Sequence, residues 1–125
     1  MKNIQNIDWL DAPEPHNYPA ALSYLSLLFD EKEASKIVKK LKKVSTVDFK
    51  SKDVFRASAL SLLGISNSHV EKNIKKMKNG EKLSPILLVR VPLTQKLIIA
   101  DGYHRMCAVY QINEDEVLKC KIVSV

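Results

Sequence analysis

The run Asp101-Gly102-Tyr103-His104-Arg105 brings together residue types that hold an anion. An apolar stretch of strand character precedes it, and a helix is expected to follow. Glycine permits a sharp turn or a close approach of the backbone to a ligand. Unpaired N–H groups and the positive end of the helix dipole collect where a helix begins, and His104 and Arg105 add cationic side chains there. The pattern therefore predicts an anion cradle at residues 101–105, most naturally for phosphate.

Each side chain of this turn also admits a plain structural role. Gly102 could serve an ordinary strand-to-helix bend. Arg105 could grip phosphate oxygens in a forked geometry, or form an ion pair with Asp101 or Glu114. Asp101 could orient Arg105 or His104, bind a metal or cap the backbone. His104 could donate to phosphate or simply pack the turn.

The candidate residues follow from these roles. The predicted phosphate- or nucleotide-binding residues are Gly102, Tyr103, His104, Arg105 and Met106. Tyr103 could stack or hydrogen-bond near a ligand, or pack as an ordinary aromatic side chain. Asp101 and His104 are the candidates for a catalytic role. His16 and His69 form no recognisable metal pattern with the cysteines, so no metal site is predicted.

The elements that must position this turn lie in the C-terminal half. Alternation and turn residues predict a hairpin, then a helix and a closing strand. The expected order is strand 86–91, turn 92–95, strand 96–100, helix 104–111 and strand 120–125. The polar residues 113–116 could start one more turn. A strand–strand–helix–strand order after a mainly helical half indicates an α+β or small α/β protein.

The N-terminal half is predicted to be an irregular arm followed by helices. Three prolines disfavour a helix through residues 1–19, and Trp9 and Tyr18 are candidates to anchor this arm. A first helix is expected over 20–29. Asp30 then caps a second helix, with Glu33 in a capping-box arrangement. The apolar stripe of that helix is Ala34, Ile37, Val38, Leu41 and Val44.

Two further helices are expected before the sheet. Ser51 or Asp53 can start a short helix that carries Val54, Ala57 and Leu60, and Gly64 is the predicted end of that region. Ser68 and Glu71 form a second capping-box pattern before the buried face Val70, Ile74 and Met77, and Gly80 follows as a stop. We therefore expect one α+β domain over 1–125, with an arm 1–19, a helical segment 20–66 and a final segment 67–125. The helical N-terminal half would pack on a small mixed sheet.

Composition limits the partners. The formal charge of +6, from 20 basic and 14 acidic residues, permits attraction to nucleotides, nucleic acid or acidic partners. Lysines cluster on predicted amphipathic helices at 36–43 and 72–78, where a solvated polar face is the plainer interpretation. Without interleaved aromatics or arginines these helices are weak evidence for base recognition. Nucleic acid bound through the lysine-rich helices stays an alternative.

The cysteine content and the hydropathy of the sequence indicate the cellular compartment. The two cysteines, Cys107 and Cys120, suit a reducing compartment better than a disulfide framework. No apolar run approaches the roughly 20 residues that span a bilayer, and the N-terminus has no apolar signal region. We therefore expect a cytoplasmic protein with no membrane partner, and the oligomeric state is left open.

Elements similar to those of the ParB N-terminal/sulfiredoxin superfamily follow in order through residues 69–125. Leu83-Ser84-Pro85-Ile86-Leu87-Leu88-Val89 resembles its Pro-led strand, and the 101–105 run occupies its signature turn. A preceding helix, the second hairpin strand, the helix 106–110 and the strand 119–123 complete the resemblance. The segment 67–125 is thus identified as ParB/sulfiredoxin-like, whereas residues 1–50 receive no family assignment.

The resemblance implies a nucleotide ligand. Members of the superfamily hold nucleotide phosphates at this turn, which implies ATP or another nucleotide, with Mg²⁺ to offset phosphate charge. Sulfiredoxins use a cysteine where this chain has Tyr103, so the redox nucleophile is missing. Cys107, one helical turn later, is expected to be inert in an apolar helix. ParB-like serine kinases also need a carboxylate base, for which the upstream candidates are Glu14, Glu31, Glu33 and Asp53.

The leading hypothesis is a ParB/sulfiredoxin-like domain that binds a nucleotide or another phosphorylated ligand at the Asp101–Arg105 turn. Phosphoryl transfer or NTP hydrolysis is the chemistry that such a site would support. The alternative is a nucleic-acid-binding or regulatory interaction module without catalytic activity. A third hypothesis keeps ligand binding but not turnover, so whether the protein is an enzyme stays open.

Overall fold

The computed structural model describes residues 6–125, and these form an α+β fold of the expected class. The element order agrees with a mainly helical first half and a strand–strand–helix–strand second half. The helices are α1 (Asn17–Leu25), α2 (Glu31–Lys43), α3 (Ser51–Ser58), α4 (Ser68–Lys78) and α5 (Tyr103–Ile112), with a 3₁₀ turn η1 (Pro92–Thr94). The strands are β1 (Val47–Lys50), β2 (Ile86–Val91), β3 (Lys96–Asp101) and β4 (Val117–Ser124). Within this part of the chain no helix is long and apolar enough to cross a bilayer.

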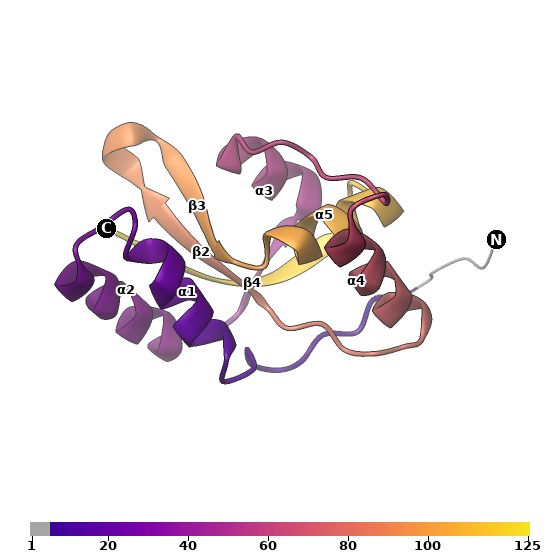
Figure 1. Ribbon diagram of the computed structural model, residues 1–125, viewed down its shortest axis with the longest axis horizontal. Helices are drawn as coiled ribbons and strands as arrows, with labels where there is room; N and C mark the ends of the chain where they lie inside the picture. The colour runs from indigo at the N-terminus through magenta and orange to yellow at the C-terminus, as the bar shows by residue number, and fades with distance from the viewer. Residues whose placement is uncertain (1–5) are drawn as a thin grey trace.

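The four strands form one mixed sheet in the order β1-β4-β2-β3 (Figure 1). Strands β2 and β3 form the predicted antiparallel hairpin, with Val89 opposite Ile98. The last strand, β4, lies in the middle of the sheet, parallel to β2 and antiparallel to β1.

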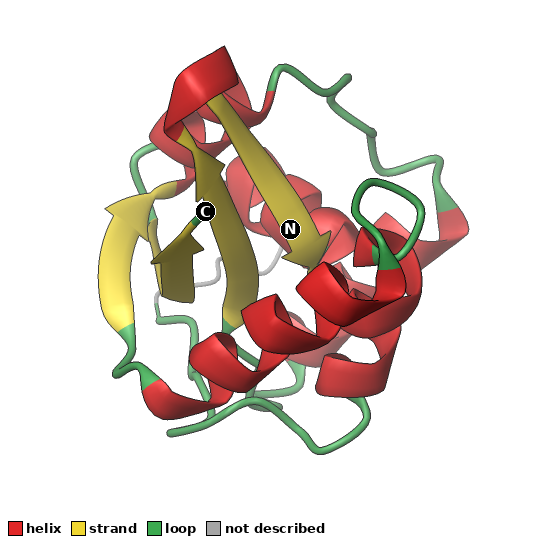
Figure 2. Ribbon diagram, turned by 90° about the vertical axis from the view of Figure 1, so that its left-hand side faces the viewer, coloured by secondary structure: helices red, strands yellow, loops and turns green. Residues whose placement is uncertain are grey.

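Helices cover both faces of this sheet (Figures 1 and 2). Side chains alternate between the two faces of a strand, and on β2 all four of the first residues are buried. Ile86 and Leu88 belong to a core shared with α3, α4 and α5. Leu87 and Val89 belong to the opposite core, shared with α1 and α2. The continuous apolar run of β2 is therefore that of a strand buried on both sides.

The second helix forms as predicted. The Asp30 side chain accepts a hydrogen bond from the Glu33 N–H at 2.8 Å, which satisfies one of the free donors of the first turn. The buried face of α2 is Ala34, Ile37, Val38 and Leu41, while Val44 caps its C-terminal end.

The arm and the first helix differ from the prediction. Trp9 does anchor the arm, because it pairs with Leu83 in an isolated parallel bridge and packs on the core. However, α1 begins at Asn17 and includes Pro19. A proline is tolerated in the first turn, since the N–H it lacks would have no partner within the helix. The helix also ends at Leu25, and turns follow to Phe29.

The segment 20–66 is not wholly helical, because it contains β1. This strand pairs with β4 from Val47 opposite Cys120 to Lys50 opposite Val117. The pairing also extends β4, which begins at Val117 and not at residue 120. The sheet is therefore built from both halves of the chain.

Two predicted helix ends are also wrong. Helix α3 stops at Ser58 because Ala59 turns left-handed at φ 55°, so Leu60 lies outside the helix and Gly64 is not its stop. Helix α4 is capped by Asn67, one residue before the predicted Ser68. The Asn67 side chain accepts from the N–H groups of residues 69 and 70.

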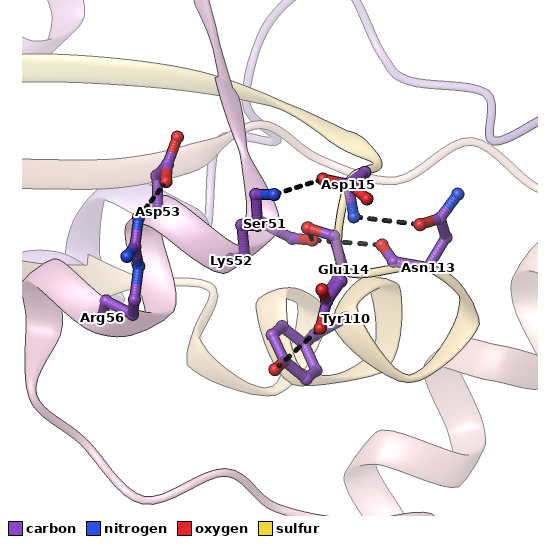
Figure 3. Close-up of polar contacts among 8 residues, drawn as sticks. All are labelled: Ser51, Lys52, Asp53, Arg56, Tyr110, Asn113, Glu114 and Asp115. Carbon is purple, nitrogen blue, oxygen red and sulfur yellow. Dashed lines mark hydrogen bonds and ion pairs between the residues drawn. The ribbon is translucent and has the colours of Figure 1, made fainter.

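Helix α3 is held at its start by the loop between α5 and β4 (Figure 3). The Ser51 hydroxyl donates to the Glu114 carbonyl at 2.8 Å, and the Lys52 ammonium lies 2.6 Å from the Asp115 carboxylate. The polar residues 113–116 form a turn here. These residues fix the position of the first turn of α3.

Candidate anion-binding site

The turn between β3 and α5 strongly favours glycine at position 102. Gly102 has φ 109°, a backbone conformation that L side chains rarely adopt. A Cβ atom there would lie 2.7 Å from Cδ1 of Ile86 and 2.9 Å from Nη2 of Arg105. The glycine therefore permits both the bend and the close approach of β2 and the Arg105 side chain.

Arg105 folds back onto the end of β3 and is mostly buried. Its Nη2 donates to Oδ2 of Asp101 at 2.9 Å and to the carbonyl of Pro85 at 3.3 Å. The side chains of Arg105 and Asp101 are only 16% and 17% exposed, so solvent screens this ion pair weakly. The Nε atom is buried without a partner. The sequence offered Asp101 or Glu114 as the ion-pair partner of Arg105, and in the structure the partner is Asp101.

The first turn of α5 offers free backbone donors. The N–H groups of Tyr103, His104 and Arg105 make no hydrogen bond to any described residue, and the turn holds no acidic side chain. Met106 differs, because its N–H donates to the Gly102 carbonyl at 2.9 Å and its side chain is fully buried. Four of the five predicted binding residues thus line the site, and Met106 lies beneath it.

Helix α4 lies across the start of α5 and closes a cleft. We define the α4–α5 cleft by residues 101–105 together with His69, Lys72, Asn73 and Lys76. It encloses about 230 Å³. The α4 residues recur at helical spacing beside the buried face of that helix. Neither cleft lysine has an ion-pair partner among the described residues, whereas Lys75 pairs with Glu71 at 3.2 Å.

The His104 side chain lies beside the rings of His69 and Tyr103. Its ring centroid lies 4.7 Å from that of His69 and 5.5 Å from that of Tyr103. Burial lowers the pKa of His104, and electrostatic repulsion from the neighbouring His69 and Arg105 lowers it further. His104 is therefore a neutral imidazole at pH 7, able to accept a proton as well as donate one.

Tyr103 and Cys107 have structural surroundings. The Tyr103 hydroxyl donates to the carbonyl of Ser61, which fastens the loop after α3 to the start of α5. Burial raises the pKa of the Tyr103 phenol and of the Cys107 thiol. Cys107 is fully buried in the core, as expected for an unreactive thiol.

The upstream carboxylates do not reach the cleft. Glu14 accepts from the Ser84 hydroxyl at 2.9 Å, Glu31 and Glu33 begin α2, and Asp53 lies beside Arg56 on α3. Asp101 is the sole carboxylate among the residues that line the α4–α5 cleft, and it is committed to Arg105. Over residues 6–125 no group of three or more His, Cys, Asp or Glu side chains is placed to hold a metal ion.

Comparisons with known proteins add no relative. A scan against protein-family models, a search of curated proteins and a search of solved structures each found no match. The resemblance to the ParB/sulfiredoxin superfamily therefore stays a prediction from the sequence.

Proposed function

We propose that the chain binds a phosphorylated ligand, with a nucleotide as the first choice, in the α4–α5 cleft. One observation carries the proposal. Two lysines of α4 with no ion-pair partner among residues 6–125, Lys72 and Lys76, line the same cleft as the N–H groups at the start of α5 that no described residue accepts from. Helix N-termini and lysine ammonium groups are complementary to phosphate in both charge and hydrogen bonding.

The positive charge of the cleft is complementary to the negative charge of a phosphate. Asp101 and Arg105 neutralise each other, and His104 is neutral at pH 7, so the surplus comes from Lys72 and Lys76. A phosphate monoester carries about −1.5 to −2 at this pH. The second terminal nitrogen of Arg105, Nη1, makes no hydrogen bond to any described residue, and Arg105 lines the same cleft.

The chain's own groups support binding more strongly than turnover. Phosphoryl transfer needs a group that orients or deprotonates the attacking hydroxyl or water. The neutral imidazole of His104 can accept that proton, whereas Asp101 is held by Arg105. Mg²⁺ would bind chiefly through the phosphate oxygens of a nucleoside triphosphate, since the cleft has no uncommitted carboxylate. We therefore rank phosphate binding first and hydrolysis or transfer second.

Calorimetry with ATP, AMP, adenosine and pyrophosphate, with and without Mg²⁺, tests the proposal. Solvent-exposed charge pairs contribute about 0.2–1 kcal/mol each. The double variant Lys72→Ala/Lys76→Ala should therefore weaken binding by up to about 30-fold. The matched control Lys75→Ala/Lys78→Ala removes the same charge from the same helix but outside the cleft. Equal loss in both variants would show that only net charge matters.

The same wild-type chain and variants also distinguish this proposal from the nucleic-acid alternative. A cleft for a small phosphorylated ligand predicts that ATP or pyrophosphate binds and that adenosine does not. Binding of duplex or single-stranded nucleic acid, with affinity that falls steeply with salt and no measurable affinity for free nucleotides, would replace the proposal by the alternative.

A further inference from the structure

A second hollow lies on the other side of α3, away from the α4–α5 cleft. We call it the apolar groove; it encloses about 490 Å³. Its apolar walls are Phe49, Val54, Ala57, Leu88, Leu97 and Ile122. These residues come from α3 and from all four strands of the sheet. None of them lines the α4–α5 cleft, so the groove is a separate feature.

The groove exists because α3 covers its face of the sheet incompletely. The helix has eight residues and ends at Ser58, where Ala59 turns the chain away. Its start is fixed by Ser51 and Lys52 on the loop before β4 (Figure 3), so the helix cannot slide along the sheet. Ala57, the last residue of α3 to line the groove, has too small a side chain to fill the space.

Polar groups of the lining give the groove a net positive charge. Asp53 is paired with Arg56 at 2.7 Å, so its carboxylate is already neutralised (Figure 3). Arg90 and Lys96 also line the groove, and no described carboxylate pairs with either. Nη1 of Arg90 is instead held by the Ser124 hydroxyl at 3.0 Å.

We propose that the apolar groove binds a straight-chain carboxylate, with the alkyl chain along the sheet and the carboxylate at Arg90. Sites for small ligands are concave, mostly apolar hollows of about 300–1,000 Å³ with a few placed polar groups. The groove has that size and that composition. A guanidinium beside an apolar channel, with no carboxylate partner among the described residues, selects an anionic head over a cationic one.

An NMR titration of the whole chain with octanoate, decanoate and dodecanoate, each below its micelle concentration, tests this proposal. Burying one methylene raises affinity about fourfold, so each step of two methylenes should raise it about 16-fold until the groove is filled. Shifted amide signals should map to the groove. Decyltrimethylammonium, with the same chain and the opposite charge, should bind far more weakly.

Three variants complete the test. Ala57→Trp fills the groove from an exposed position and should abolish decanoate binding; a thermal melt verifies that it folds. Arg90→Gln should weaken binding about three- to fivefold, whereas Lys39→Gln on α2, across the sheet, should leave it unchanged. Equal binding of the ammonium compound, no dependence on chain length, or full binding by folded Ala57→Trp would each overturn the proposal.

Discussion

Replacing each glycine by alanine gives a graded test of the turn that forms the candidate site. At Gly102 alanine meets two costs. A left-handed backbone costs a residue with a Cβ about 1–2 kcal/mol, and forcing an atom into packed surroundings costs about 1–3 kcal/mol. The new methyl would lie 2.7 Å from Cδ1 of Ile86, a fully buried side chain with little room to move. We expect Gly102→Ala to lower the free energy of unfolding by about 2–5 kcal/mol.

Two matched controls separate these costs. Gly80 has φ 71° but nothing within 4 Å of the added Cβ, so Gly80→Ala should cost only the backbone strain of about 1–2 kcal/mol. Gly64 has neither a positive φ nor a close neighbour, and Gly64→Ala should be neutral or stabilise by up to about 1 kcal/mol. Urea unfolding followed by circular dichroism measures all three. A Gly102→Ala cost no larger than that of Gly80→Ala would refute the close packing inferred at the turn.

Two further predictions concern titratable groups. Because the pKa of His104 is lowered below its ordinary value of 6.5, the unfolded chain binds more protons than the native one just below that pH. Stability should therefore fall as pH drops through 6.5, and His104→Asn should flatten this dependence in urea unfolding measured from pH 7.5 to 5; an unchanged slope would contradict it. Burial raises the pKa of Cys107, and that of Cys120 to about 12. Neither thiol should react with a disulfide reagent at pH 8 faster than the protein unfolds, and rapid labelling in mass spectra would refute this.

Strong local patterns were enough to predict several elements. Strand β2 was predicted with the bounds that the structure has, because five apolar residues in a run of six precede a turn at Pro92. Helix α2 was equally predictable, since its cap at Asp30 and its apolar stripe agree with each other. In both cases the signal lies within one short window of sequence.

The first strand could not be found in this way. Residues 47–50 form only four pairs, and Phe49 alone is partly buried, so the segment has little hydrophobic pattern of its own. Its partner β4 is distant in the sequence, because Val47 pairs with Cys120. Pairing over that distance leaves no local trace, and the residues were therefore predicted to lie in a helical segment.

Only one side of the candidate site, the turn at 101–105, could be predicted from the sequence, whereas the α4 side could not. The turn at 101–105 combines glycine with cationic side chains and was identified from its residue types. Periodicity also gave the buried face of α4, yet it could not say that Lys72 and Lys76 would face this turn. That fact depends on how α4 packs on α5. The one available signal was the spacing of a histidine, an asparagine and two lysines on a single face of the helix preceding the hairpin.

The central place of β4 constrains how the chain can fold during synthesis. A ribosome delivers β1, β2 and β3 first, yet β1 has no neighbour in the sheet other than β4. Until residues 117–124 emerge, β2 has only β3 beside it and one side of its backbone is unpaired. Contacts that span most of the chain slow folding. We expect the nascent chain to stay incompletely folded until β4 inserts, with an open strand edge that a chaperone can protect.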